Sequence, residues 1–145
     1  MAIVVGIDGS AGSTEALRWA IAEAQLRNTA IDAVYAWSFP RLGVSYTWAP
    51  PFDEPTLESM QAAAFDALGR TIDEVENPHG IEIRPRVVEG PAGAILVEVS
   101  EGADLLVVGS RGLGGFKELL LGSVGHQCAQ HARCPVVIIH QPKSN

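Results

Sequence analysis

Basic residues are scarce in this chain of 145 residues. Ten Lys and Arg stand against 17 Asp and Glu, which gives a formal net charge of −7. Proteins that follow the backbone of DNA or RNA, or that adhere to anionic membranes, need a basic surface. We therefore expect no nucleic acid and no membrane as a partner. One small anionic ligand stays compatible with this charge, because main-chain N–H groups and a single Arg can form a local positive site.

Long apolar runs and cysteines are also few. No stretch approaches the roughly 18–20 consecutive apolar residues that span a membrane. The first residues, MAIVVGID, lack a basic segment and reach a carboxylate at Asp8. This start is not typical of a secretory signal, so we expect a cytoplasmic protein. In that compartment the two cysteines, Cys128 and Cys134, are expected to be reduced thiols.

The composition is that of a globular protein, with 47% hydrophobic and 19% charged residues, and the length suits a single domain at 1–145. Short β-branched segments alternate with segments of helical periodicity. The predicted strands are 2–7, 31–37, 81–90, 103–110 and 135–140. The first predicted helix can be capped by Ser10 or Ser13 and runs to about residue 27. The other predicted helices span 56–76, 91–102, with Pro91 in its first turn, and 123–132. Between them, residues 38–55 contain four prolines and predict an irregular loop.

This alternation predicts an α/β fold with a doubly wound, five-stranded parallel sheet and helices on both faces. Right-handed crossovers favour the strand order 3-2-1-4-5, and Pro85 favours an edge position for the third strand. In such sheets, ligands bind beyond the carboxyl ends of the strands where the order reverses. Here the reversal lies between the first and fourth strands. The turns GIDGS and VVGSRG that follow them should therefore face each other.

Glycines are concentrated in the second of these turns and the segment after it. Gly109, Gly112 and Gly122-Ser123 are spaced G-x2-G-x9-G-S. Glycine lets a ligand approach the main chain closely, and the predicted helix that starts at Ser123 favours an anion at its N-terminus. Arg111 and Lys117 can add positive charge. The pattern is neither a P-loop, since G-K-[ST] is missing, nor a complete G-x-G-x-x-G.

Five segments together carry a family resemblance: VVGIDGS, VYAW, VVEGPAGAI, ADLLVVGSRG and LLLGSVGHQCAQHARCPVVIIH. They resemble the universal stress protein family, and G-x2-G-x9-G-[ST] marks its ATP-binding branch. The resemblance implies a nucleotide-dependent regulatory or sensor module with ATP, together with Mg²⁺, as its cofactor. It also implies a homodimer joined along the last strand, from Pro135 to His140.

The resemblance further implies a set of nucleotide-binding residues. Gly6 and Asp8 would lie beside the ribose and adenine, and the main chain of Ala36 would touch the base. Under the nucleotide would lie Val108 and Gly109, and the phosphates would be held by Gly112, Gly122, Ser123 and Val124 with Arg111 as a further partner.

Several alternatives stay open at this point. Asp8 can instead cap the helix that follows it. His126, Cys128, His131 and Cys134 offer zinc ligand types, but their positions along a helix do not converge, which favours a buried Cys128 and partly exposed histidines. No catalytic constellation is evident, so we expect no enzyme beyond slow, incidental ATP hydrolysis. A binder of cyclic AMP or AMP, a slow ATPase and a ligand-free module that self-associates through the last strand are the other functions considered.

Overall fold

The computed structural model of the protein describes residues 1–38, 56–112 and 121–141. Apart from Ser38, the predicted loop at 38–55 lies outside these ranges, as does Lys117. Within them the chain alternates strands and helices as predicted. The elements are β1 (Ala2–Ile7), α1 (Ala11–Arg27), β2 (Ala30–Trp37), α2 (Leu57–Glu74), β3 (Ile83–Glu89), α3 (Ala92–Val99), β4 (Leu105–Gly109), α4 (Ser123–His131) and β5 (Val136–Ile139).

All five strands of the sheet are parallel, in the order β3-β2-β1-β4-β5. This confirms the predicted order. Pro85 lies in the edge strand β3 opposite Ala33 of β2, as expected for a residue that cannot donate a main-chain hydrogen bond. β1 pairs with β2 on one side and with β4 on the other. The order therefore reverses between β1 and β4, and both strands end at the same edge of the sheet.

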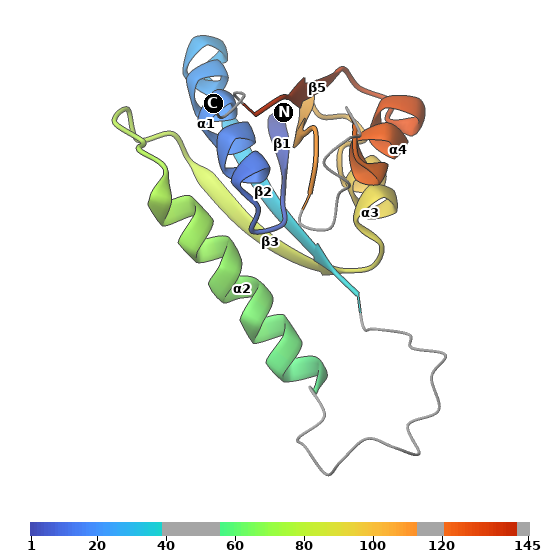
Figure 1. The fold of residues 1–145 in the computed structure, drawn as a ribbon. Coiled ribbons are helices and arrows are strands. Elements are labelled where there is room, and N and C mark those ends of the chain that lie inside the picture. Colours follow the sequence, from blue (N-terminus) through green and yellow to red (C-terminus); the bar gives the residue numbers. More distant parts are fainter. Residues whose placement is uncertain (39–55, 113–120, 142–145) are drawn as a thin grey trace, which may run out of the picture.

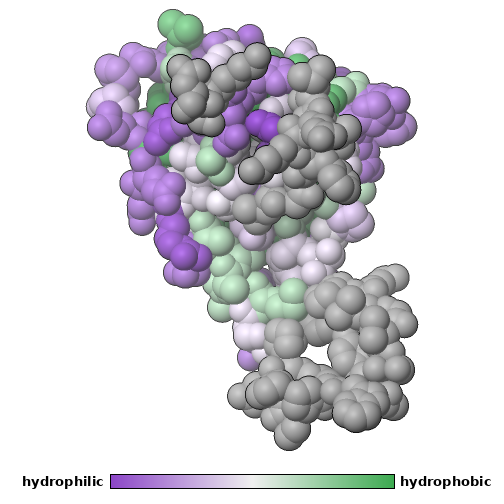
Figure 2. Space-filling model, in the orientation of Figure 1, coloured by the Kyte–Doolittle hydropathy of each residue, from purple (hydrophilic) through white to green (hydrophobic). Residues whose placement is uncertain are grey.

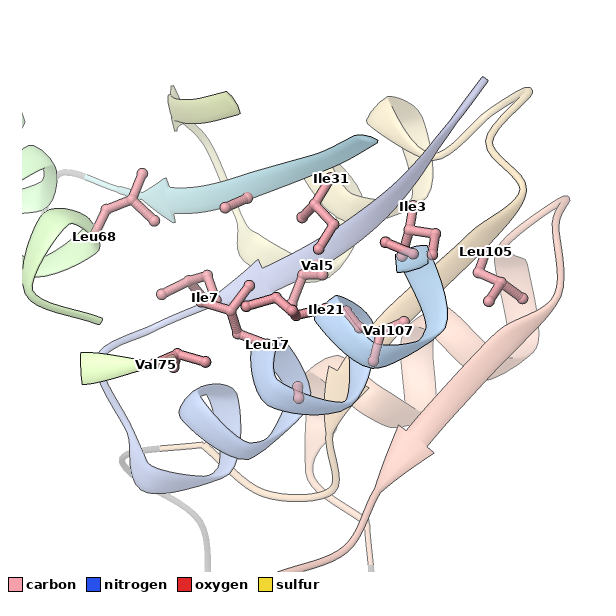
Figure 3. Close-up of a cluster of buried hydrophobic side chains, with 14 residues drawn as sticks. Ile3, Val5, Ile7, Leu17, Ile21, Ile31, Leu68, Val75, Leu105 and Val107 are labelled. Carbon is pink, nitrogen blue, oxygen red and sulfur yellow. The ribbon is translucent and has the colours of Figure 1, made fainter. Parts of the chain in front are cut away.

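Helices cover both faces of the sheet, α1 and α2 on one and α3 and α4 on the other (Figure 1). β1 supplies both layers, because successive side chains of a strand point to opposite faces. Ile3, Val5 and Ile7 pack with Leu17 of α1, among the cluster shown in Figure 3. Val4 packs in the other layer. β1 is thus buried on both of its faces.

The first half of α2 leaves large apolar side chains exposed. It reaches past the end of the sheet (Figure 1), and Leu57 and Phe65 are 55% and 49% exposed. Hydrophobic surface is visible over this helix in Figure 2. None of the helices within the described ranges combines the length and the apolar character that a membrane span needs.

The third helix begins and ends inside its predicted range of 91–102. Pro91, expected within the first turn, is instead the N-cap, and the helix ends at Val99. Gly102 follows with a φ of 82°, in the left-handed region that glycine adopts readily and that cannot continue a helix. Ala92 and Leu96 of this helix line a cavity at the sheet edge where β1 and β4 end.

The structure also places the four residues considered as zinc ligands. Cys128 is fully buried in the core, while His126 and His131 are exposed. In the part of the chain that the structure covers, no group of three or more His, Cys, Asp and Glu could hold a metal ion. Burial, followed by the nearby Cys134, raises the pKa of the Cys128 thiol from 9.0 to about 11.

Alkaline conditions are expected to destabilise the fold through Cys128. In the unfolded chain its thiol ionises near pH 9, whereas in the folded protein its pKa is about 11. The stability present below pH 9 is therefore lost as the pH rises towards 11. Urea unfolding between pH 8 and pH 11 measures this loss. In Cys128→Ala the free energy of unfolding should depend less on pH than in the wild type, whereas Cys134→Ala should keep most of the wild-type dependence. Equal dependence in Cys128→Ala and the wild type would contradict the prediction.

Candidate functional site

A cavity of about 440 Å³ opens where β1 and β4 end, at the point where the strand order reverses. This volume lies within the usual range of small-molecule sites. The ten residues predicted from the sequence all line it: Gly6, Asp8, Ala36, Val108, Gly109, Arg111, Gly112, Gly122, Ser123 and Val124. The structure thus brings the predicted set together in one place, while the role of each residue in binding stays a prediction.

One wall of the cavity is the turn after β1, from Asp8 to Ser13. Ser10 is the N-cap of α1, and its side chain accepts a hydrogen bond from the Ser13 N–H at 3.2 Å. Asp8 is therefore not the cap. Its Oδ1 accepts hydrogen bonds from the N–H of Ser10, at 2.9 Å, and from the Ser10 hydroxyl. The carboxylate is held at the cavity rather than used by the helix.

The opposite wall joins the turn after β4 to the start of α4. Ser110, which is 3% exposed, donates its N–H to the Ile139 carbonyl of β5. Its own carbonyl accepts a hydrogen bond from the Gly122 N–H. Gly122 is the N-cap of α4 and provides no side-chain cap. The first N–H groups of a helix have no partners within the helix, and Ser123 and Val124, which begin α4, both line the cavity.

Glycines allow these two walls to come close together. A Cβ on Gly109 would lie 2.9 Å from the carbonyl carbon and oxygen of Gly12 in α1. A Cβ on Gly112 would lie 2.7 Å from Oδ2 of Asp8. Real Cβ contacts are not that short, so any side chain at either position forces a neighbour to move. The glycine motif therefore sets the width of the cleft.

The inner end of the cavity is apolar. Val34, Ala36 and Val108 come from the sheet, and Leu96 comes from α3. Leu96 fits against β1 because position 6 is glycine: a Cβ there would lie 2.7 Å from Cδ1 of Leu96. This end suits a flat, apolar group such as an aromatic base, whose faces need no hydrogen bonds.

The charges lie toward the outer end. Among the described lining residues, Asp8 and Arg111 are the charged ones. With the start of α4 beside them, they favour a ligand that carries both an anionic group and a hydrogen-bond donor. The same described lining contains no Lys, His or Cys.

Among the described lining residues, eight were not predicted as site residues: Ile7, Ser10, Ser13, Val34, Ala92, Leu96, Ser110 and Gly125. Val34 could have been found, since it lies two residues before Ala36 and so points to the same face of the sheet. Ser10 was predicted only as a possible helix cap. Ala92 and Leu96 carry no local signal, because their place depends on how α3 crosses the sheet.

Together these features define a class: an open, doubly wound α/β protein with a ligand-sized cavity at its switch point, bounded by glycine turns and a helix N-terminus. Within this class, the family model of the universal stress proteins matches residues 1–140. The chain belongs to the universal stress protein family.

Its relatives include Universal stress protein Rv2623 of Mycobacterium tuberculosis, which is 37% identical over 139 residues. That match covers 96% of this chain but 45% of the relative, so the chain spans about half the length of the curated relatives it matches. A solved universal stress protein in complex with cAMP is 26% identical, with a TM-score of 0.73 and 98% of both chains covered. A universal stress protein from Archaeoglobus fulgidus in complex with dAMP is 19% identical, with a TM-score of 0.60 and 96% and 97% coverage, and shows the shared fold.

Proposed function

We propose that this chain binds an adenine nucleotide, ATP in particular, in the cavity between β1 and β4. The observation that carries the proposal is the convergence of Asp8, the glycine turn after β4 and the N-terminus of α4 on one cavity with an apolar inner end. In this arrangement the base takes the inner end and the phosphates face α4. The relative in complex with cAMP supports an adenine nucleotide as the ligand class.

ATP is favoured over AMP and cyclic AMP because the glycine spacing continues to a second cluster at the start of α4. A ligand without β- and γ-phosphates would lose contacts at Ser123 and Val124. Calorimetric titration of nucleotide-stripped protein with ATP, ADP, AMP and cyclic AMP tests this order. We expect ATP to bind most tightly. No heat of binding for any of the four at millimolar concentration would falsify the proposal.

Mg²⁺ is proposed to enter with the nucleotide. This ion takes oxygen ligands and is usually held by one or two carboxylates together with phosphates and water. Asp8 is the carboxylate of the described cavity lining, and this described part of the lining alone offers Mg²⁺ too few ligands. We expect Mg²⁺ to show no binding by itself and to change the affinity for ATP.

Within the proposal, the chain is a regulatory or sensor module whose conformation or assembly responds to the nucleotide, and any hydrolysis is slow. Asp8, whose Oδ1 is already hydrogen-bonded to Ser10, is the sole candidate base among the described lining residues. The rate of phosphate release from ATP, compared between wild type and Asp8→Ala, separates a regulatory module from an ATP-hydrolysing enzyme. Several turnovers per minute that Asp8→Ala abolishes would favour an enzyme.

Replacing Asp8 by alanine is expected to weaken ATP binding by about 10- to 100-fold, because a hydrogen bond to a charged group is lost. Asp8→Asn keeps an oxygen acceptor and should lose less. Calorimetric titration gives the dissociation constants. Asp66→Ala is the matched control, since this carboxylate is exposed on α2 and 73% of its side chain is in contact with solvent. Equal affinity in Asp8→Ala and Asp66→Ala would remove Asp8 from the site.

The homodimer is proposed to form along β5, from Pro135 to His140. β5 is an edge of the sheet, its four residues are partly exposed, and an exposed edge can pair with another strand. Mass measurement with and without ATP shows whether the chain dimerises and whether the dimer depends on the ligand. A cytoplasmic location stays a prediction from the sequence.

A further inference from the structure

We propose that Ser10 is a positioning residue for the ligand: it holds one oxygen of Asp8 so that the other is presented to the cavity. This inference rests on the proposed nucleotide binding. It gives Ser10 a role besides capping α1, and it defines what kind of ligand group Asp8 can meet.

The side chains of Asp8, Ser10 and Ser13 form a closed hydrogen-bond network. The Ser10 hydroxyl donates to Oδ1 of Asp8 and accepts from the Ser13 N–H. The Ser13 hydroxyl donates to the Ser10 carbonyl at 3.0 Å and accepts from the Asp8 N–H at 3.3 Å. A hydroxyl has one proton to donate. Although both serines line the cavity, neither has a proton left for a ligand, so their part is to orient Asp8.

Oδ1 and Oδ2 of Asp8 consequently differ. Oδ1 accepts two hydrogen bonds, from the N–H and the hydroxyl of Ser10. Oδ2 is the atom nearest to the space beside Gly112, 2.7 Å from where a Cβ would be. An ionised carboxylate oxygen only accepts hydrogen bonds. A ligand group that meets Oδ2 directly, with no Mg²⁺ between them, must therefore be a donor, a hydroxyl or an amino group. A phosphate oxygen at this point would be repelled, which sets the direction in which a nucleotide enters.

Capping and positioning use the Ser10 hydroxyl in opposite ways, and this makes them separable. The cap uses its oxygen as an acceptor for the Ser13 N–H, whereas positioning uses its proton as a donor to Asp8. Ser10→Thr keeps both functions. Ser10→Ala removes both. Ser10→Gly removes the hydroxyl too, but glycine is tolerated at an N-cap almost as well as serine.

The chain offers a matched control for loss of a cap. Thr56 is the N-cap of α2 and accepts the Ser59 N–H at 3.0 Å, outside the cavity lining. Thr56→Ala should lower the unfolding temperature about as much as Ser10→Ala does. It should not change the affinity for ATP.

The experiment titrates ATP into nucleotide-stripped wild type and variants. Ser10→Ala and Ser10→Gly are expected to bind about tenfold more weakly, and Ser10→Thr within about threefold of wild type. Adding Ser10→Ala to Asp8→Ala should cause no further loss, because a positioning residue acts through the group it holds. Unchanged affinity in Ser10→Ala, or the same tenfold loss in the Asp8→Ala background, would overturn the inference.

A second measurement keeps the inference independent of the proposed function. If wild type binds no ATP, the proposed function fails, and crystal structures of ligand-free wild type and Ser10→Ala still decide the role of Ser10. The Asp8 carboxylate is expected to leave its position in Ser10→Ala and to keep it in Thr56→Ala. A carboxylate that stays in place without the Ser10 hydroxyl would refute positioning.

Discussion

Gly122→Val is expected to weaken ATP binding by about 100-fold while leaving the fold intact. Gly122 has φ −73° and ψ 172°, which valine adopts without strain. A Cβ there would lie 3.4 Å from the Ser110 carbonyl oxygen and 3.5 Å from Cα of Arg111, ordinary contact distances. The two methyl groups of valine would then occupy the space between the turn after β4 and the start of α4. Phosphate contacts worth about 3 kcal/mol would be lost, which corresponds to this factor.

The N–H of Gly122 sharpens this expectation. It already donates to the Ser110 carbonyl, so Gly122 is not itself a phosphate donor in this arrangement. Its part is to leave room for the ligand beside the N–H groups of Ser123 and Val124. Gly122→Ala should therefore cause an intermediate loss of affinity, in proportion to the volume added.

Calorimetric titration with ATP measures the effect, and thermal unfolding shows that the variant is folded. Gly69→Val is the matched control, because nothing lies within 4 Å of a Cβ added at this position of α2. It should bind ATP like wild type. If Gly122→Val also binds like wild type, the phosphates do not pass between the two glycine turns.

The fold could be predicted from the sequence because each local signal agreed with the others. Short apolar strands alternate with helical segments, and Pro85 lies at the edge where a missing N–H is tolerated. The strand order then placed the turns after β1 and β4 opposite each other. The ten site residues that the family resemblance implies all line the cavity between these turns.

The remainder of the site depends on tertiary packing that has no local pattern. Leu96 reaches the cavity from α3 only because Gly6 leaves space in β1. The hydrogen bonds that join Asp8, Ser10 and Ser13 depend on side-chain conformations, and a serine at an N-cap predicts no more than a cap. The hydrogen bond from the Gly122 N–H to the Ser110 carbonyl likewise depends on how β4 and α4 pack in the folded chain.

Gly109 belongs to the same glycine motif as Gly122, but Gly109→Val is expected to lower the stability of the fold. Gly109 ends β4, and a Cβ there would lie 2.9 Å from the carbonyl carbon and oxygen of Gly12 and 3.2 Å from its Cα. These are main-chain atoms at the start of α1, which cannot turn aside as a side chain can. Gly12 is itself crowded by the turn after β4, since a Cβ on Gly12 would lie 2.9 Å from the Arg111 carbonyl oxygen.

Because α1 must move away from β4, Gly109→Val should lower the free energy of unfolding by about 3 kcal/mol, the upper part of the usual range for overpacking. For a domain of this size the unfolding temperature would fall by roughly 10 °C. Urea and thermal unfolding of the ligand-free protein measure both. Gly69→Ala should instead gain about 0.5–1 kcal/mol, as expected for glycine replaced within a helix. Wild-type stability in Gly109→Val would mean that α1 does not rest on β4 through these two glycines, and the width of the cleft would then have to be set by other residues.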